Sequence, residues 1–316
     1  MSEPLVLHAD DQARLRRPVL GYSMVLAATA LWGINGSLAK AALSSGLTSL
    51  RLTEVRSTGA ALILVAALAA TRSRSLRITR KELPFLLLFG VIGLAFVQLF
   101  YFVAIHRLDI GIALLIQYLA PVLIALYARL FLKEPVRRRV WAALILSLGG
   151  LSLVVDLWSG VALDGLGVLA ALTSAVTFAL YILLAENAVA RRDPVSLLAL
   201  GFTFAAIFWA VVQPWWSFPT EYLDDRIHMD GALFSTTLSV SALLAGVILI
   251  GTIVPFLLLV GALRHVSATR AGVTAMFEPV AGALVAWAWL GESLTTTQLV
   301  GGAIVLTGIL LAQTAR

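Results

Sequence analysis

Apolar residues in this chain are gathered into ten long runs, separated by short polar segments. Each run approaches the roughly 20 residues that an α-helix needs to cross the apolar core of a bilayer. The predicted spans are residues 19–39, 52–71, 84–105, 110–131, 140–157, 166–186, 195–216, 236–260, 268–290 and 298–312. The first run follows a polar tail and is too long for the apolar part of a typical signal peptide. We therefore interpret it as an uncleaved helix.

One pattern occurs in two of these runs. In residues 267–292, a polar residue begins an apolar run, a proline interrupts it near the centre, and a glutamate follows thirteen residues later. The proline is Pro279, and subtracting 158 from its number gives Pro121. The same shift takes Glu292 to Glu134. A unit that occurs twice indicates a duplication, so the chain is predicted to contain two repeats.

Each predicted repeat holds five spans. Because five is an odd number, the second repeat must enter the membrane in the opposite orientation to the first. The predicted organisation is a tail at residues 1–18, a first five-helix repeat at 19–157 and a second, inverted repeat at 164–314. This predicts an all-α membrane protein with ten transmembrane helices. Inverted repeats are typical of secondary transporters, whose substrate site lies between the repeats near the middle of the bilayer.

The composition is that of a membrane protein. Hydrophobic residues make up 60% and charged residues 13% of the chain, against about 45–50% and about 25% in an ordinary soluble domain. Cysteine is absent, which excludes disulfides and thiolate metal sites. The four histidines show no metal-ligand spacing, and no GxxxxGK phosphate-binding motif occurs. We therefore expect no metal, no cofactor and no ATP-driven pump.

The net charge of +6 arises mainly from loops on one side of the predicted membrane. Basic residues gather in alternate segments, which are residues 14–17, 72–81, 133–139, 191–192 and 264–270. The other loops are mainly acidic. Because basic loops stay in the cytoplasm, both termini are predicted to be cytoplasmic. This distribution explains the basic excess without a nucleic-acid partner.

The chain contains LxPVxxAL around Pro121, KEP at Lys133, the block FEPVAGALVAWAWLGESLTTTQLVGGAIVLTGILL, and Leu31-Trp32-Gly33. Together these segments resemble the drug/metabolite transporter superfamily, in its ten-span EamA-type branch. The resemblance covers residues 20–314. It implies a ten-helix bundle of inverted repeats, an inner-membrane location and the export of amino acids or other small metabolites. The four-span multidrug members of the superfamily carry a proton-binding glutamate in their first span, and this chain has no carboxylate there.

Glu278 lies at the centre of the ninth predicted span, directly before Pro279. A carboxylate at this depth costs about 2.5–3.5 kcal/mol on insertion scales, so it is expected to face protein or a water-filled cavity. One interpretation is that it exchanges a proton or meets a substrate ammonium group. The other is that it bonds backbone groups freed by Pro279, or a polar neighbour, and has only a structural role. No lysine or arginine is expected at the middle of a span, where an anion would need one.

Other polar and aromatic side chains inside the predicted spans are candidates for substrate binding. A shift of 146 matches the first spans of the two repeats and takes Trp32 to Phe178. The predicted substrate-binding residues are Trp32, Asn35, Gln98, Tyr101, Gln117, Tyr118, Phe178, Tyr181 and Glu278. For the glutamines and tyrosines the alternative is a hydrogen bond between helices. Pro121, Pro255 and Pro279 are predicted to kink their helices and to act as hinges between the repeats.

These patterns favour a secondary transporter that exports small metabolites, amino acids first among them, by alternating access. Deep aromatic side chains would suit an aromatic or bulky apolar substrate, and Glu278 would suit coupling to protons. Uptake or exchange of another metabolite, such as a sugar phosphate, is an alternative. An integral membrane enzyme acting on lipids is the alternative from another class, and it would need a nucleophile or metal cluster that is not found. We expect a monomer in the lipid bilayer, with a small-molecule substrate and no catalytic residues.

Overall fold

The computed structural model describes residues 17–105, 107–108, 110–133, 135–155, 164–230, 235–290 and 295–314. Within these ranges, nine helical segments are long and apolar enough to cross a membrane. They are Pro18–Leu43, Ser49–Leu76, Leu83–Ala104, Ile112–Leu130, Gly165–Ala188, Pro194–Val212, Val240–Ala262, Ala268–Trp289 and Thr296–Gln313. The chain is therefore an all-α membrane protein, as predicted. The tail at residues 1–16 and the repeated glutamates Glu134 and Glu292 lie outside the described residues.

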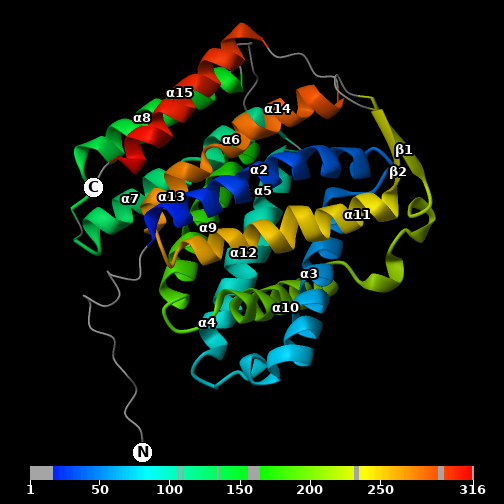
Figure 1. Ribbon diagram of the computed structural model, residues 1–316. Coiled ribbons are helices and arrows are strands. Elements are labelled where there is room, and N and C mark those ends of the chain that lie inside the picture. Colours follow the sequence, from blue (N-terminus) through cyan, green and yellow to red (C-terminus); the bar gives the residue numbers. More distant parts are fainter. Residues whose placement is uncertain are drawn as a thin grey trace, which may run out of the picture.

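The helices and strands follow one another without a separate soluble domain in the described part of the chain (Figure 1). In chain order they are α2 (Pro18–Leu43), α3 (Ser49–Arg72), η1 (Ser73–Leu76), α4 (Leu83–Leu87), η2 (Leu88–Phe96), α5 (Val97–Ile105), α6 (Ile110–Gln117), α7 (Ala120–Leu130), α8 (Arg138–Val154), α9 (Gly165–Ala188), α10 (Pro194–Val212), η3 (Trp215–Ser217), η4 (Thr220–Tyr222), β1 (Arg226–Asp230), β2 (Ser235–Ser239), α11 (Val240–Ile248), η5 (Leu249–Ile253), α12 (Val254–Ala262), α13 (Ala268–Ala275), α14 (Glu278–Leu290) and α15 (Thr296–Gln313).

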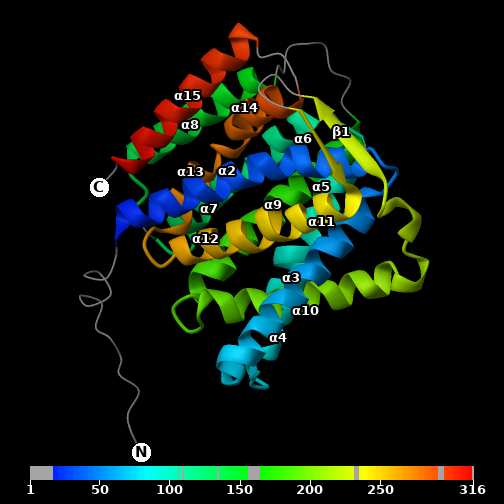
Figure 2. The same ribbon diagram turned by 45° about the vertical axis from the view of Figure 1, so that its right-hand side comes forward.

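Helix α8 occupies the fifth predicted span. It has 17 residues and packs along α15 at one edge of the bundle (Figure 1 and Figure 2). Its Ile145 is 72% exposed, as suits an apolar side chain that faces lipid. The count of ten spans and the inverted relation of the repeats stay predictions.

Long helices from the two halves of the chain pack against each other. Helix α2 contacts α12 and α14, α3 packs along α10, and α5 packs along α9. The pair of α8 and α15 follows the same rule. Because each pair joins residues 17–155 to residues 164–314, the two halves share one hydrophobic core.

Polar side chains cap the N-termini of several helices. Asp164 and Asp193 accept hydrogen bonds from the backbone N–H groups of Gly167 and Ser196, at 2.7 and 3.0 Å. These bonds satisfy N–H groups that a helix leaves unpaired in its first turn. Thr295 begins α15 with a capping box that is completed by the Gln298 side chain.

Two predicted spans are broken at equivalent positions. Residues 118–119 separate α6 from α7, and residues 276–277 separate α13 from α14. The shift of 158 takes the first break onto the second. In each case a proline follows within the first turn of the next helix, where its missing N–H is tolerated. The predicted interruption by Pro121 and Pro279 is confirmed.

The third and eighth predicted spans each contain a π-helical segment. These segments are η2 and η5, and the shift of 158 places η5 within the bounds of η2. Such segments are uncommon and occur frequently at functional sites. The hydrophobic pattern of these spans gives no sign of them.

The eighth span begins later than predicted. Residues 236–239 were expected to be helical, but they belong to strand β2, which pairs antiparallel with β1. Thr236 and Thr237 are β-branched and suit a strand. Helix α11 then begins after Ser239, whose side chain accepts a hydrogen bond from the Ala242 N–H at 3.2 Å.

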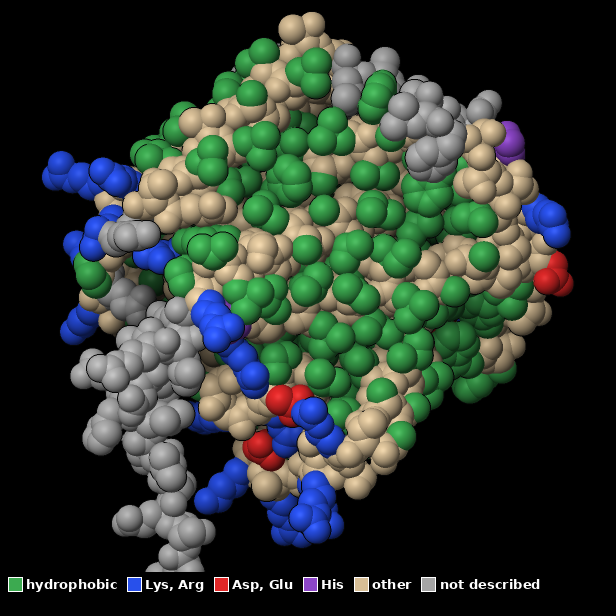
Figure 3. Space-filling model, in the orientation of Figure 1, with side chains coloured by type: hydrophobic (Ala, Val, Ile, Leu, Met, Phe, Trp, Pro, Cys, Tyr) green, Lys and Arg blue, Asp and Glu red, His purple; other side chains and the backbone are tan. Residues whose placement is uncertain are grey.

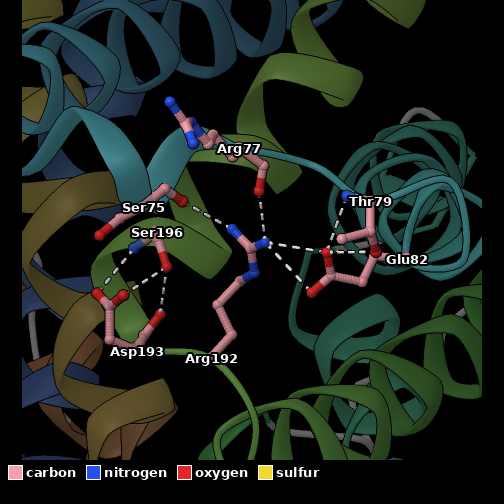
Figure 4. A network of polar contacts seen from close by, with 7 residues as sticks. All are labelled: Ser75, Arg77, Thr79, Glu82, Arg192, Asp193 and Ser196. Atoms are coloured by element: carbon pink, nitrogen blue, oxygen red, sulfur yellow. Dashed lines mark hydrogen bonds and ion pairs between the residues drawn. The ribbon is translucent and has the colours of Figure 1, made fainter. Parts of the chain in front are cut away.

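A polar network at one end of α3 and α10 is built around Arg192 (Figure 4). Its guanidinium donates to the carbonyl oxygens of Ser75 at 2.8 Å and Arg77 at 3.0 Å, and to the Glu82 carboxylate at 3.2 Å. The Thr79 backbone N–H, the Thr79 hydroxyl and Arg192 hold the pKa of Glu82 below its ordinary value. A depressed pKa in the folded state means that this contact contributes to stability at neutral pH and loses that contribution as the pH falls through the folded-state pKa.

Arg51 makes a corresponding network at the other ends of α3 and α10. Its guanidinium donates to the carbonyl oxygens of Pro214 at 3.3 Å and Ser217 at 3.1 Å. It also pairs with Glu54 at 2.6 Å. We call the contacts of Arg51 and Arg192 with these carbonyl groups the two arginine clasps. Each clasp joins one half of the chain to the other.

The surface of the bundle is apolar over a broad band. Figure 3 shows this band across one face, with lysine and arginine side chains gathered at the end that carries the N-terminus. An exposed apolar surface of this extent marks contact with another apolar phase. For helices of this length that phase is the lipid bilayer.

Candidate functional site

A cavity of about 310 Å³ lies between the helices of the two halves. Every predicted substrate-binding residue except Tyr181 lines it, namely Trp32, Asn35, Gln98, Tyr101, Gln117, Tyr118, Phe178 and Glu278. The structure therefore brings these side chains together around one space. Their role in binding a substrate stays a prediction.

Glu278 is the first residue of α14, and its position at the helix break directs it towards the cavity. Its Oε2 accepts a hydrogen bond from the Tyr118 hydroxyl at 2.6 Å. Tyr118 lies in the equivalent break between α6 and α7, so this bond connects the two broken helices. A carboxylate at a helix N-terminus is also favoured by the helix dipole. Both interpretations of Glu278 fit this geometry, because the group is anchored and yet open to the cavity.

Gln117 and Gln98 form a second polar wall. Gln117 Nε2 donates to Ser174 Oγ at 3.0 Å, and Ser174 Oγ donates to the Val97 carbonyl oxygen at 3.0 Å. This chain connects α6, α9 and α5. Gln98 Oε1 is buried and has no hydrogen-bond partner among the described residues. An unsatisfied acceptor at a cavity wall is suited to a donor group on a ligand.

No lysine or arginine was expected at the middle of a span, and Arg56, which lies towards one end of α3, nevertheless reaches the cavity. It belongs to α3, is 9% exposed and lines the cavity. Its Nε donates to Thr252 Oγ1 at 3.0 Å, and its Nη2 donates to the Gly251 carbonyl oxygen at 3.0 Å. Both partners belong to the π-helical segment η5. The cavity wall therefore presents a cation as well as the carboxylate of Glu278.

Asn35 packs directly against the same π-helical segment. A Cβ atom at Gly251 would overlap the Asn35 side chain, so this approach requires a glycine. The other half has an equivalent contact, because Tyr181 packs against Gly93 in η2. The shifts of 146 and 158 relate Asn35 to Tyr181 and Gly93 to Gly251.

Tyr181 is the predicted site residue that the structure places elsewhere. It is 1% exposed and its ring stacks on Phe178 and Phe89, with centroid distances of 6.2 and 5.7 Å. The atoms of Tyr181 that lie nearest Gly93 are its Cα and Cβ, whereas Asn35 approaches Gly251 with its side-chain amide and also lines the cavity. Tyr181 therefore supports the aromatic wall from behind instead of lining the cavity.

Aromatic rings form the apolar part of the cavity wall. Trp32 and Phe256 meet edge to face, with centroids 5.3 Å apart. Phe178, Tyr101 and Phe102 also line the cavity. This wall suits the apolar part of a small ligand.

The three predicted hinge prolines lie at irregular points of the helices. Pro121 and Pro279 follow the two breaks, and Pro255 follows the π-helical segment η5. Pro121 also packs close to Gly272 of α13, across the two halves. Their action as hinges stays a proposal.

The sequence reasoning missed Arg56, Phe256 and Phe102 as cavity residues. For Arg56 a signal was present, since a charged residue inside a predicted span is costly and marks a candidate site. For the two phenylalanines no signal was present, because an apolar residue in an apolar span carries no positional information. Within the described part of the chain, no three His, Asp or Glu residues lie together as metal ligands.

Comparison with known proteins agrees with this architecture. The threonine/homoserine exporter RhtA of Escherichia coli (strain K12) is 28% identical over 299 residues, which are 92% of this chain and 91% of that protein. The uncharacterized inner membrane transporter YicL of Salmonella typhimurium is 24% identical over 296 residues, or 92% of this chain and 94% of that protein. A crystal structure matches with a TM-score of 0.72 at 19% identity, and the match covers 92% of this chain and 96% of the other. That last likeness shows the fold alone.

The family comparison covers both halves of the sequence. The pattern of the EamA-like transporter family matches residues 19–156 and again residues 165–314. The match thus extends over nearly all of the residues that form the bundle. The chain therefore belongs to the EamA-like transporter family.

Proposed function

We propose that this protein is a secondary transporter of the inner membrane that exports small zwitterionic metabolites, amino acids first among them, by alternating access. The observation that carries the proposal is the cavity itself. It lies where two broken helices meet, and it combines a carboxylate, amide groups and an aromatic wall. Binding sites formed by discontinuous helices near mid-bilayer are typical of secondary transporters.

An amino acid carries the groups that this cavity can satisfy. Its ammonium group matches Glu278, and its side chain matches the wall around Trp32 and Phe256. The name of the relative RhtA, a threonine/homoserine exporter, supports the same class of substrate. The aromatic wall extends the proposal to aromatic or bulky apolar amino acids.

Uptake or exchange of a sugar phosphate is the second candidate, and Arg56 is the observation that favours it. A phosphate needs a cation, and a guanidinium binds it well. A phosphate dianion would, however, share the cavity with the Glu278 carboxylate. The wall contains two cationic side chains, Arg56 and Lys40, and one anionic side chain, Glu278. Charges of both signs in one wall fit a zwitterion better than a phosphate dianion.

A lipid-modifying enzyme is less well supported. The described side chains that line the cavity include no serine, cysteine or histidine that could act as nucleophile or base. The relatives are named transporters.

The test is a transport assay with the purified protein in proteoliposomes and a panel of radiolabelled amino acids, amines and sugar phosphates. We expect saturable, protein-dependent flux of at least one amino acid and none of the sugar phosphates. Protein-free liposomes are the control. Flux of a sugar phosphate without any amino-acid flux would replace the first candidate by the second.

We further propose that both termini are cytoplasmic, on the basis of the charge distribution. Ser73 in η1, within the basic segment 72–81, and Thr220 in η4 are both exposed, and the chain has no native cysteine. In intact cells an impermeant thiol reagent is expected to label Thr220→Cys but not Ser73→Cys. Lysed cells should show labelling of both variants. The reverse pattern in intact cells would invert the orientation.

A further inference from the structure

We propose that Arg56 binds the carboxylate of the substrate, while Glu278 and Tyr118 receive its ammonium group at another part of the cavity wall. This inference rests on the proposed function and identifies the residue that recognises the acid group. It follows from the bonding of the guanidinium and from the presence of both charges in the wall of one cavity.

The guanidinium of Arg56 is held in place and only partly used. A guanidinium has five N–H donors. The bonds to Thr252 Oγ1 and the Gly251 carbonyl oxygen use the Nε donor and one Nη2 donor. Among the described residues Nη1 has no hydrogen-bond partner, and the side chain faces the cavity. Donors therefore remain for a ligand.

The π-helical segment η5 is what fixes the guanidinium. Thr252 Oγ1 donates to the Val247 carbonyl oxygen, five residues earlier, at 2.8 Å. With its hydrogen given to Val247, this hydroxyl presents a lone pair to Arg56 Nε. The Gly251 carbonyl oxygen accepts the second bond. A guanidinium oriented in this way loses little side-chain freedom when it binds a carboxylate.

Arg56 makes no ion pair with a carboxylate in the described part of the chain, although Glu278 acts on it electrostatically. The nearby acidic residue of α3 is Glu54, and it pairs with Arg51 at 2.6 Å. Glu278 lies in the same cavity but bonds Tyr118, and no ion pair joins it to Arg56 among the described residues. A buried cation that bonds no anion directly is costly. A substrate carboxylate would supply that direct bond.

The presence of Arg56 and Glu278 in the wall of one cavity gives a selection rule. A zwitterion satisfies Arg56 and Glu278 together. An amine without a carboxylate leaves Arg56 unpaired, and a simple acid leaves Glu278 unpaired. A ligand that leaves buried charged groups of the site unpaired is rejected more strongly than a ligand that only fits loosely.

The experiment measures competition by unlabelled compounds against the labelled amino acid that the wild type transports best, with the full chain in proteoliposomes. The competitors are the same amino acid and its α-carboxamide, which keeps the ammonium group and the side chain but lacks the acid. The wild type is expected to prefer the acid. Arg56→Gln is expected to lower the affinity for the amino acid about tenfold to a hundredfold, which is the range for lost hydrogen bonds to a charged group. The affinity for the carboxamide should be nearly unchanged.

Two further variants keep the result interpretable. Arg56→Lys retains the positive charge but lacks the planar guanidinium. It should therefore lower the affinity for the amino acid and not for the carboxamide, and it provides the test even if Arg56→Gln fails to fold. Lys40→Gln removes another cation that lines the cavity and is expected to retain the preference for the acid. Equal loss of acid and carboxamide in the Arg56 variants, or a selective loss in Lys40→Gln, would overturn the assignment while leaving amino-acid transport in place. If the wild type itself transports no amino acid, the proposed function fails first.

Discussion

Glu278→Gln is expected to abolish substrate accumulation driven by a pH gradient, while exchange down a substrate gradient continues. Glutamine keeps the shape of the side chain and can still accept the Tyr118 hydroxyl, which now bonds the carboxylate at 2.6 Å. It cannot take up or release a proton. Because Glu278 faces the cavity from the break in the helix, it is placed to bind a proton and the substrate ammonium in turn. The measurement is flux in proteoliposomes with and without an imposed pH gradient.

The matched control for this variant is Tyr118→Phe. It removes the hydrogen bond but leaves the carboxylate, so the response to the pH gradient should persist with an altered substrate affinity. An identical gradient response in the wild type and Glu278→Gln would assign Glu278 to the structural role beside Pro279. A wild type that ignores the gradient would make the protein a facilitator.

Gly150→Ala is expected to destabilise the bundle, whereas its neighbour Gly149→Ala should not. A Cβ atom at Gly150 would lie 2.7 Å from the Gly301 carbonyl oxygen and 2.8 Å from the Val305 amide nitrogen. These are backbone atoms of α15 and cannot rotate away, so the two helices would have to separate. Overpacking of this kind costs about 1–3 kcal/mol. Thermal unfolding of the purified protein in detergent measures the effect.

Gly149 provides the comparison within the same turn of α8. Nothing lies within 4 Å of a Cβ atom built there. Alanine is better than glycine inside a helix by about 0.5–1 kcal/mol, so Gly149→Ala should unfold at an equal or higher temperature than the wild type. Equal destabilisation by both substitutions would show that the loss reflects general sensitivity of α8 and not close packing against α15.

The sequence predicts the broken helices well because proline has a fixed local consequence. Pro121 and Pro279 lack a backbone donor, and each is the second residue of the helix that follows a break. The π-helical segments η2 and η5 carry no such marker. They depend on packing between helices that are distant in sequence, as the contact of Asn35 with Gly251 illustrates.

In the candidate site, too, part of the arrangement could be predicted from the sequence and part depends on packing between distant helices. Repeat spacing places Asn35 and Tyr181 on equivalent helix faces, and both do pack against a glycine of the opposite half. Only Asn35 borders the cavity, because the Tyr181 ring stacks on Phe178 and Phe89, and the repeat spacing contains no information on such stacking. Arg56 shows a different limit. An arginine four residues inside a predicted span could reach towards the membrane surface or turn inwards, and only the position of Thr252 decides between them.

The two arginine clasps have a mechanical consequence. Arg51 and Arg192 tie α3 to the loops of α10 at opposite ends of both helices. Because each clasp crosses from one half of the sequence to the other, neither half can swing as a rigid body without breaking backbone contacts at both membrane faces. Helices α3 and α10 are instead expected to move together as one rigid unit. For the proposed alternating access, we therefore expect the cavity to open by movement of the broken helices relative to α3 and α10, with Arg56 kept in place on α3.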